Sequence, residues 1–281
     1  MIPWILMASN RPQATIKSLR RYQAFANVII YVHERDEDSF RKTFQDKLLP
    51  SPNIITHAIP GNCPMGGIRY YGMSLLQERM GKVDCGVLVD DDLGSVRFAD
   101  LSTLMPTKKG NGEMPRYPVL DSRGFHRELV RLANEAAGTF PYFTTSLYAR
   151  SGNGFKASRT FLASLNWSGF FGFFKNSFNP FDRKFQAEAD YEAQFKAVKH
   201  FGTLPVLKYP SLVTEYAFES KAYLLSGHPK YEARQKATKE IKRRYGRLVL
   251  VSCNNSTGVL QPKIDPAVNR TLKMTVLEKY R

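Results

Sequence analysis

The sequence predicts an α/β fold built around a doubly wound, mainly parallel sheet. In roughly the first 90 residues, four short apolar runs rich in β-branched residues alternate with three segments that carry apolar residues at helical spacing. Such alternation is typical of βαβ units, whose right-handed crossovers place the strands in one sheet. The chain has 281 residues, 43% of them hydrophobic, which suffices for one large domain or two small ones.

The elements of the first half follow from these runs. We expect strands over Pro3 to Ala8, Val28 to Val32, Asn53 to Ala58 and Cys85 to Val89, and helices over Gln13 to Phe25, Ser39 to Leu48 and Ile68 to Met80. Ligands of such sheets bind at the carboxyl ends of the strands. Three polar groups fall at those ends: Ser9-Asn10-Arg11, His33-Glu34 and Asp90-Asp91-Asp92, the last of which we name the acidic triplet.

The second half alternates less regularly, with Gly and Pro clusters between its apolar segments. Its predicted elements are an exposed loop over Thr107 to Pro118, a helix over Gly124 to Ala137, antiparallel strands at Tyr142 to Tyr148, Phe155 to Leu165 and Phe170 to Phe174, a helix over Ala187 to Phe201, a strand near Leu204 to Lys208, and a basic helix over Tyr231 to Tyr245. An apolar stripe of Ala233, Ala237, Ile241 and Tyr245 marks the buried face of that basic helix.

Charge is the unusual global feature of the chain. Its 41 Lys and Arg against 25 Asp and Glu give a net charge of +16. Residues 221 to 281 hold 14 of the cations and only 4 of the anions. A polyanionic partner is therefore plausible, with a soluble basic protein as the alternative.

Other global features exclude several classes of protein. Three distant cysteines form neither a disulfide framework nor a zinc ligand set. The apolar start of the chain is broken at Ser9 to Pro12, so we expect no signal peptide, no membrane span and a cytoplasmic location. No stable protein partner can be inferred.

The acidic triplet is the strongest chemical signal. Three adjacent carboxylates at the end of a buried strand repel one another, a cost usually tolerated where a cation sits among them. Mg²⁺ or Mn²⁺ takes one or two carboxylates and completes its shell with water and substrate phosphates. The alternate residues Asp90 and Asp92 suit that role, while Asp91 points elsewhere. An acidic turn capped by Asp92 is the structural alternative.

With this triplet the sequence resembles the GT-A glycosyltransferases, whose nucleotide-sugar domain leads to an Asp-x-Asp motif after the fourth strand. A second match is the stretch Phe181-Asp-Arg-Lys-Phe185 followed by Glu188-Ala-Asp190-Tyr-Glu192, which looks like the acceptor-side segment of that family. Ala189 stands where the family usually has Glu. Whether Glu188 or Asp190 is catalytic therefore stays open, and first-turn helix stabilisation is the alternative for both.

The resemblance, which covers about residues 3 to 210, implies a GT-A-like fold and a UDP-sugar donor. It implies a nucleotide-sugar-binding half over residues 1–98, an acceptor-binding half of the same domain over 99–215 and a basic C-terminal region over 216–281. Ser9 and Arg11 would hold the nucleoside, with Asp91 also on the donor side, and Arg69 would clamp the diphosphate. His228 would join Asp90 and Asp92 on the metal. Asp190 would accept the acceptor's proton in an inverting reaction.

Within that superfamily the chain looks most similar to the TET-associated DNA glycosyltransferases of bacteriophages, which implies double-stranded DNA with hydroxymethylated pyrimidines as acceptor. Trp167 or Phe178 would stack on an extruded base, and a place in the apolar core is the alternative for both. The cations expected to contact phosphates are Arg234, Lys236, Lys239, Lys242, Arg243, Arg244 and Arg247. The rival hypotheses are transfer to a saccharide or protein, a non-catalytic nucleic-acid-binding protein, and a metal-dependent nuclease.

Overall fold

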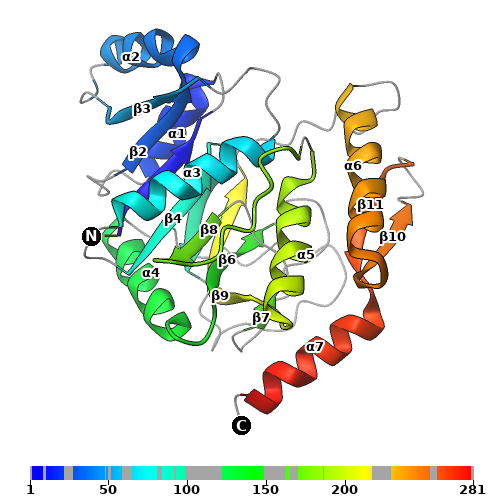
Figure 1. Ribbon diagram of the computed structural model, residues 1–281. Helices are drawn as coiled ribbons and strands as arrows, with labels where there is room; N and C mark the ends of the chain where they lie inside the picture. The colour runs from blue at the N-terminus through cyan, green and yellow to red at the C-terminus, as the bar shows by residue number, and fades with distance from the viewer. Residues whose placement is uncertain are drawn as a thin grey trace, which may run out of the picture.

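A mixed sheet lies at the centre of the molecule. The computed structural model describes residues 2–8, 11–21, 28–47, 49, 52–58, 65–80, 84–91, 93–98, 122–148, 162–164, 170–185, 187–216, 229–253 and 258–279. Among these residues the sheet has nine strands in the order β3-β2-β1-β4-β8-β6-β9-β5, with β7 paired to β9 (Figure 1).

The first half of the chain forms the parallel part of this sheet. Its elements are β1 (Trp4–Met7), α1 (Pro12–Arg21), β2 (Val28–His33), the 3-10 turn η1 (Glu34–Asp36), α2 (Glu37–Asp46), β3 (Ile54–His57), α3 (Met65–Arg79) and β4 (Cys85–Asp90). All three pairings among β1, β2, β3 and β4 are parallel, as the alternation of strands and helices predicts.

The second half adds the antiparallel part. Its elements are β5 (Leu93–Phe98), α4 (Ser122–Ala136), β6 (Tyr142–Tyr148), β7 (Leu162–Ser164), β8 (Phe170–Phe174), α5 (Ala189–Phe201) and β9 (Val206–Tyr216). β8 runs antiparallel to both β4 and β6, which confirms the expected antiparallel extension, whereas β6 and β9 pair in parallel. β9 therefore points the same way as β4. Because α5 precedes β9 and runs back along the sheet, it begins at the edge where β4 ends.

Alternate side chains of the strands build two cores, one on each face of the sheet. Trp4 and Leu6 of β1 pack with α4 in one cluster, while Ile5 and Met7 pack with α3 and α5 in the other. Figure 1 shows α3 and α5 side by side in front of the sheet. Three layers result, and α3 and α5 meet over the carboxyl ends of the strands.

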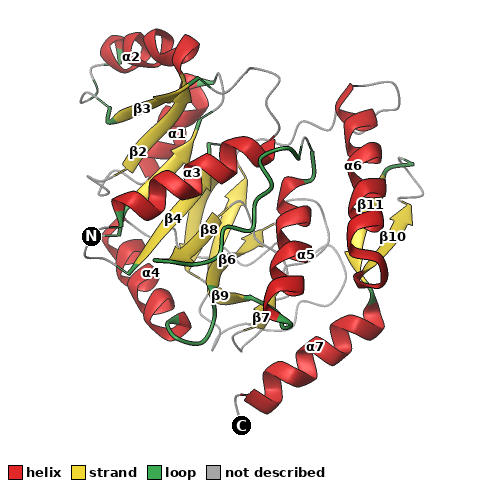
Figure 2. Ribbon diagram, in the orientation of Figure 1, coloured by secondary structure: helices red, strands yellow, loops and turns green. Residues whose placement is uncertain are grey.

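The C-terminal part of the chain packs on α5. It comprises α6 (Pro229–Tyr245), the 3-10 turn η3 (Gly246–Leu248), a two-stranded antiparallel sheet of β10 (Val249–Cys253) and β11 (Leu260–Ile264), and α7 (Pro266–Lys279). Ala237 and Ile241 of the predicted stripe are buried against Phe185 and Phe195. α6 therefore lies beside α5, as Figure 2 shows.

Some elements differ from the sequence prediction. β5, β10, β11 and α7 were not expected, and the strand predicted to end at Lys208 continues to Tyr216. Of the strand predicted over 155–165, the described residues contain only Leu162–Ser164, and the loop predicted over 107–118 lies outside the described residues. No helix in the described part of the chain has the length and apolar character needed to cross a membrane.

Candidate active site

In a doubly wound sheet this strand order predicts a ligand crevice between β1 and β4. The chain leaves β1 toward β2 on one side and returns through α3 to β4 on the other, so the carboxyl ends of β1 and β4 form the point where the topology reverses. Ligands of doubly wound sheets bind at such a point. Met7 and Asp90 are register partners there.

Two arginines from different elements pair with the acidic triplet. Arg69, in the first turns of α3, donates from Nη2 to both carboxylate oxygens of Asp90, at 3.1 and 3.4 Å. Arg11, just before α1, donates to Asp91 Oδ1 at 2.6 Å. The Asp91 side chain is only 5% exposed, whereas that of Asp90 keeps 20% of its surface open. Asp91 therefore holds Arg11, and Asp90 is the more exposed of the two carboxylates.

Arg69 joins the donor side of the crevice to the acceptor side. Its side chain is 7% exposed and lies over the ring of Phe171, with Cζ 5.1 Å from the ring centre. While Nη2 holds Asp90, Nη1 lies 3.7 Å from Asp190 Oδ1 in the first turn of α5. The structure thus brings together Asp90, Arg69 and Asp190, three residues that the sequence predicted for the site. Arg69 lies 21 residues before Asp90 and more than 100 residues before Asp190.

Glu188 and Asp190 differ in their surroundings. The Asp190 side chain is 36% exposed, whereas Glu188 is 6% exposed and forms a very short ion pair with Nε of Arg234 in α6. Burial, together with the charge of Asp190, raises the pKa of Glu188 to about 7, against the opposing charges of Arg234 and Arg69. Asp190 is consequently the carboxylate open to a substrate, and Glu188 lies behind it.

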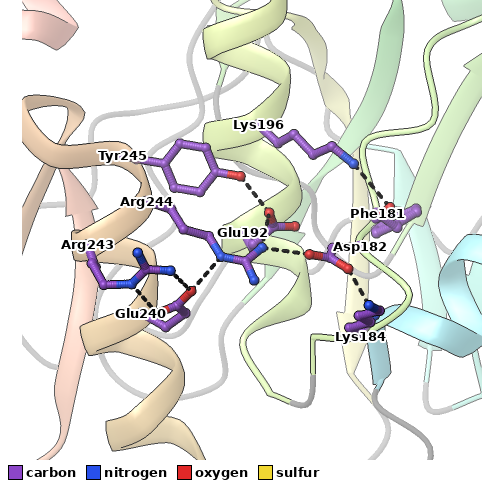
Figure 3. A network of polar contacts seen from close by, with 9 residues as sticks. All are labelled: Phe181, Asp182, Lys184, Glu192, Lys196, Glu240, Arg243, Arg244 and Tyr245. Carbon is purple, nitrogen blue, oxygen red and sulfur yellow. Dashed lines mark hydrogen bonds and ion pairs between the residues drawn. The ribbon is translucent and has the colours of Figure 1, made fainter.

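The other end of α6 carries a second polar network (Figure 3). Arg244 donates to Asp182 Oδ2 at 2.6 Å and to Glu240 Oε1 at 2.8 Å, and lies 3.6 Å from Glu192 Oε1. Tyr245 donates its hydroxyl proton to the same Glu192 oxygen at 2.5 Å. Burial raises the pKa of Glu192, although the hydrogen bond from Tyr245 partly opposes it. Burial also acts against ionisation of Asp182, but the hydrogen bonds from Arg244 and Lys184 N, with the charges of Arg244 and Lys196, together outweigh it and lower that pKa.

The cations predicted to contact DNA thus separate into two groups. Four of them make contacts within the chain: Arg234 with Glu188, Arg244 with the network above, Arg243 with Glu240, and Lys242 with the carbonyls of Gly246 and Val249. Lys236, Lys239 and Arg247 are exposed. Sequence reasoning missed that α6 supplies cations to α5, although Arg234 and Arg244 directly flank its apolar stripe.

Two histidines lie side by side at the ends of β2 and β3. His33 and His57 are register partners, and their ring centres lie 5.3 Å apart. The ring centre of Tyr31 lies 4.7 Å from that of His57. Burial and the neighbouring His33 lower the pKa of His57 to about 4.

Phe178, one of the two residues predicted to stack on a base, stacks instead on His200 near the end of α5, away from Asp190, with ring centres 4.1 Å apart.

Several predicted site residues lie outside the described residues, namely Ser9, Asp92, Trp167 and His228. Within the described part of the chain no three His, Cys, Asp or Glu side chains gather to hold a metal ion. Asp90 nevertheless fits one edge of a Mg²⁺ or Mn²⁺ site. It is partly open, it ends a buried strand, and these ions need only one or two carboxylates when substrate phosphates and water supply the remaining ligands.

Comparisons with known proteins show the fold. No protein-family model matches the sequence, and no curated protein matches it. The structure is similar to that of glucosyl-3-phosphoglycerate synthase from Mycobacterium tuberculosis in complex with Mn²⁺ and uridine-diphosphate-glucose, with a TM-score of 0.51 and 11% identity over 95% of this chain and 86% of that one. It is also similar to a mycobacterial protein, with a TM-score of 0.50 and 11% identity over 95% and 84% of the two chains.

The fold is GT-A-like. The central mixed sheet, its parallel first half and these structural neighbours agree with the fold that the acidic triplet suggested. Nothing in the comparisons points to the DNA glycosyltransferases of bacteriophages.

Proposed function

We propose that the chain is a metal-dependent glycosyltransferase that moves a sugar from a UDP-sugar to an acceptor hydroxyl. The observation that carries the proposal is the Asp90–Arg69–Asp190 chain of ion pairs, which joins the end of β4 to the start of α5 in one crevice. The neighbour crystallised with Mn²⁺ and uridine-diphosphate-glucose supports the choice of donor and metal.

The donor half uses residues at the ends of β1 and β4. Asp90, with Asp92 as its partner, would hold Mn²⁺ or Mg²⁺, which as a Lewis acid stabilises charge on the diphosphate leaving group. Arg69, held against Asp90, places a fixed cation beside the same phosphates. Arg11, held by Asp91 and 46% exposed, presents its guanidinium to the nucleotide together with Ser9.

The acceptor half uses Asp190. In transfer with inversion, the bond between the sugar C1 and the diphosphate oxygen breaks and its electron pair leaves with UDP. A bond from C1 to the acceptor oxygen forms, and the hydroxyl proton passes to the Asp190 carboxylate. Asp190 suits this role because its side chain is 36% exposed, and so open to substrate, and because it lies in the first turn of α5 beside Arg69. Glu188 is the buried alternative.

His228 completes the proposed metal shell. Support comes from the described residues on both sides of it: Tyr216, at the end of β9, pairs with Leu93 beside the acidic triplet, and Arg234 pairs with Glu188. The chain therefore reaches the crevice on both sides of His228.

For the acceptor we propose a hydroxymethylated pyrimidine in double-stranded DNA. The net charge of +16 and the exposed Lys236, Lys239 and Arg247 support it, and Trp167 is the proposed stacking residue. A saccharide or protein acceptor is the second candidate, since the name of a structural neighbour, glucosyl-3-phosphoglycerate synthase, contains no nucleic acid. A non-catalytic nucleic-acid-binding protein is the third.

The test is UDP release from UDP-glucose with Mn²⁺, with and without hydroxymethylated DNA, followed by mass analysis of the nucleosides. We expect Asp90→Asn and Asp190→Asn to lower turnover about 100-fold or more, and Asp46→Asn, exposed on α2, to leave it unchanged. Turnover independent of DNA would move the acceptor to a saccharide or protein. Salt-sensitive DNA binding without turnover would favour the binding protein, and cleavage of plain DNA in Mg²⁺ would refute the transferase.

A further inference from the structure

Glu188 has a backbone conformation that its surroundings must maintain. It precedes α5 with φ 55° and ψ 30°, a left-handed conformation that side chains other than Gly and Asn rarely adopt. Its side chain makes no capping hydrogen bond to α5, although its carbonyl accepts the first helical bond from Glu192 N. Such strain persists where neighbouring contacts fix it, and it often marks functional sites.

The contact that fixes Glu188 comes from α6. The side chains of Glu188 and Arg234 are 6% and 16% exposed, so the pair is shielded from water. Removal of either partner from a shielded pair leaves a charge without compensation. Arg234 is 46 residues away in sequence, yet it is the cation in direct contact with Glu188.

A second contact from α6 holds the next turn of α5. Glu192 is 1% exposed and faces both Arg244 and Tyr245. Asp190 lies between Glu188 and Glu192 and faces Arg69 of α3. Three carboxylates spaced two residues apart are thus each matched by an arginine, and two of the arginines come from α6.

We propose that α6 is a positioning element of the acceptor half of the site, in which Arg234 and Arg244 fix the carboxylates on either side of Asp190. The inference rests on the proposed function. Arg234 and Arg244 are then positioning residues, and their charges serve the site instead of a polyanion. The exposed face of α6, with Lys236 and Lys239, remains the face for an external partner.

The pair is expected to respond to pH. The charged groups that face Glu188 are Arg234 of α6, Asp190 of α5 and Arg69 of α3. Below the Glu188 pKa of about 7 the carboxyl is protonated and its ion pair with Arg234 is lost. We therefore expect the kcat of the wild-type protein to rise between pH 6 and pH 8.

The experiment compares Arg234→Gln, Arg234→Lys and the wild-type chain in the Mn²⁺-dependent UDP-release assay from pH 5.5 to 8.5. Arg131→Gln is the matched control, because Arg131 forms ion pairs with Glu128 and Glu135 of its own helix α4, on the opposite face of the sheet. We expect Arg234→Gln to lower kcat about 10- to 100-fold and to abolish the rise near pH 7. The KM for UDP-glucose should change less than about twofold, because the donor residues are untouched.

Each outcome has a separate meaning. No UDP release by the wild-type chain refutes the proposed function itself. Wild-type activity together with an unchanged kcat and pH profile in Arg234→Gln overturns the positioning role alone. If Arg234→Gln does not fold, Arg234→Lys carries the test: it keeps the charge and should keep the rise near pH 7 with a smaller loss of kcat. Loss of that rise in Arg234→Lys also overturns the inference.

Discussion

At the scale of single residues, each of three carboxylates at the site is paired with an arginine from another part of the chain. Asp91 has Arg11, Asp90 has Arg69, and Glu188 has Arg234. Arginine suits these places because its planar guanidinium group can donate hydrogen bonds to two groups at once and stays charged when desolvated. Arg69 shows the advantage directly, since its two terminal nitrogens face Asp90 and Asp190.

Glu188 makes the stability of the fold depend on pH. Its pKa in the folded chain, about 7, is above its ordinary value of 4.5. The folded chain therefore favours protonated Glu188 more strongly than the unfolded chain does. The stability that this preference adds is complete below pH 4.5 and is lost as the pH rises through about 7. Between pH 5 and pH 8 the wild-type chain should lose ~2 kcal/mol more unfolding free energy than Glu188→Gln. Urea unfolding at both pH values measures this difference, and parallel pH profiles would contradict the expectation.

Gly66 allows α3 to begin against the loop before α5. A Cβ at this position would lie 2.1 Å from the carbonyl oxygen of Asp182, and Gly66 N donates to the carbonyl of Phe185. Because the obstacle is backbone, we expect Gly66→Ala to cost about 3 kcal/mol of unfolding free energy. Gly202→Ala is the control: φ is +67° there but the space is open, so the cost should be about 1 kcal/mol. Equal losses in urea unfolding would refute the steric argument.

At the scale of elements, α6 combines two functions on two faces. Its apolar stripe and the flanking Arg234 and Arg244 face α5, whereas Lys236, Lys239 and Arg243 are exposed. A count of basic residues along the helix does not separate these faces. The partner of a cation depends on its angular position around the helix relative to the buried stripe.

Two adjacent arginines of α6 test this division. Arg244 holds Asp182 and the buried Glu192, whereas the exposed Arg243 pairs only with Glu240 among the described contacts. Arg244→Ala should cost about 2 kcal/mol of unfolding free energy, less than for a fully buried pair because Arg244 is 34% exposed. Arg243→Ala should leave the urea midpoint unchanged. Equal shifts in the two midpoints would show that the contacts of Arg244 with Asp182 and Glu192 (Figure 3) add no stability.

At the scale of the whole molecule, the three-layer fold brings residues far apart in sequence to one edge of the sheet. Parallel strands all end at that edge, and α3 and α5, which precede β4 and β9, begin there. The net charge of +16 is a property of the same scale. It attracts polyanions over a distance, while local contacts determine where they bind.

Salt dependence distinguishes these two effects. If DNA binds the exposed cations of α6 and of the turn η3 that follows it, replacing Lys236, Lys239 and Arg247 by Gln should reduce the slope of log Kd against log salt concentration by about 3. Replacing Arg41, Lys42 and Lys47 at α2 removes the same charge from another exposed surface and should reduce the slope by less than about 1. Equal reductions in titrations of labelled duplex DNA would indicate attraction by net charge alone.

The sequence by itself determined the α/β fold and the place of the acidic triplet. Alternating apolar runs and helical periodicities are local patterns, and parallel strands bring their carboxyl ends together whatever the loops do. It also determined the buried stripe of α6, since Ala237 and Ile241 lie against α5 as their spacing indicates. These features depend on residues a few positions apart.

The tertiary structure alone decided the course of β9 and the partners of the α6 cations. The strand predicted to end at Lys208 continues past Pro210 as β9. A proline is tolerated there because a register shift between Thr145 and Ser146 leaves residues 210–212 outside the ladder with β6. Arg234 and Arg244 meet Glu188 and Asp182 across 46 and 62 residues. No spacing in a sequence encodes such pairs, because they depend on how α6 packs against α5.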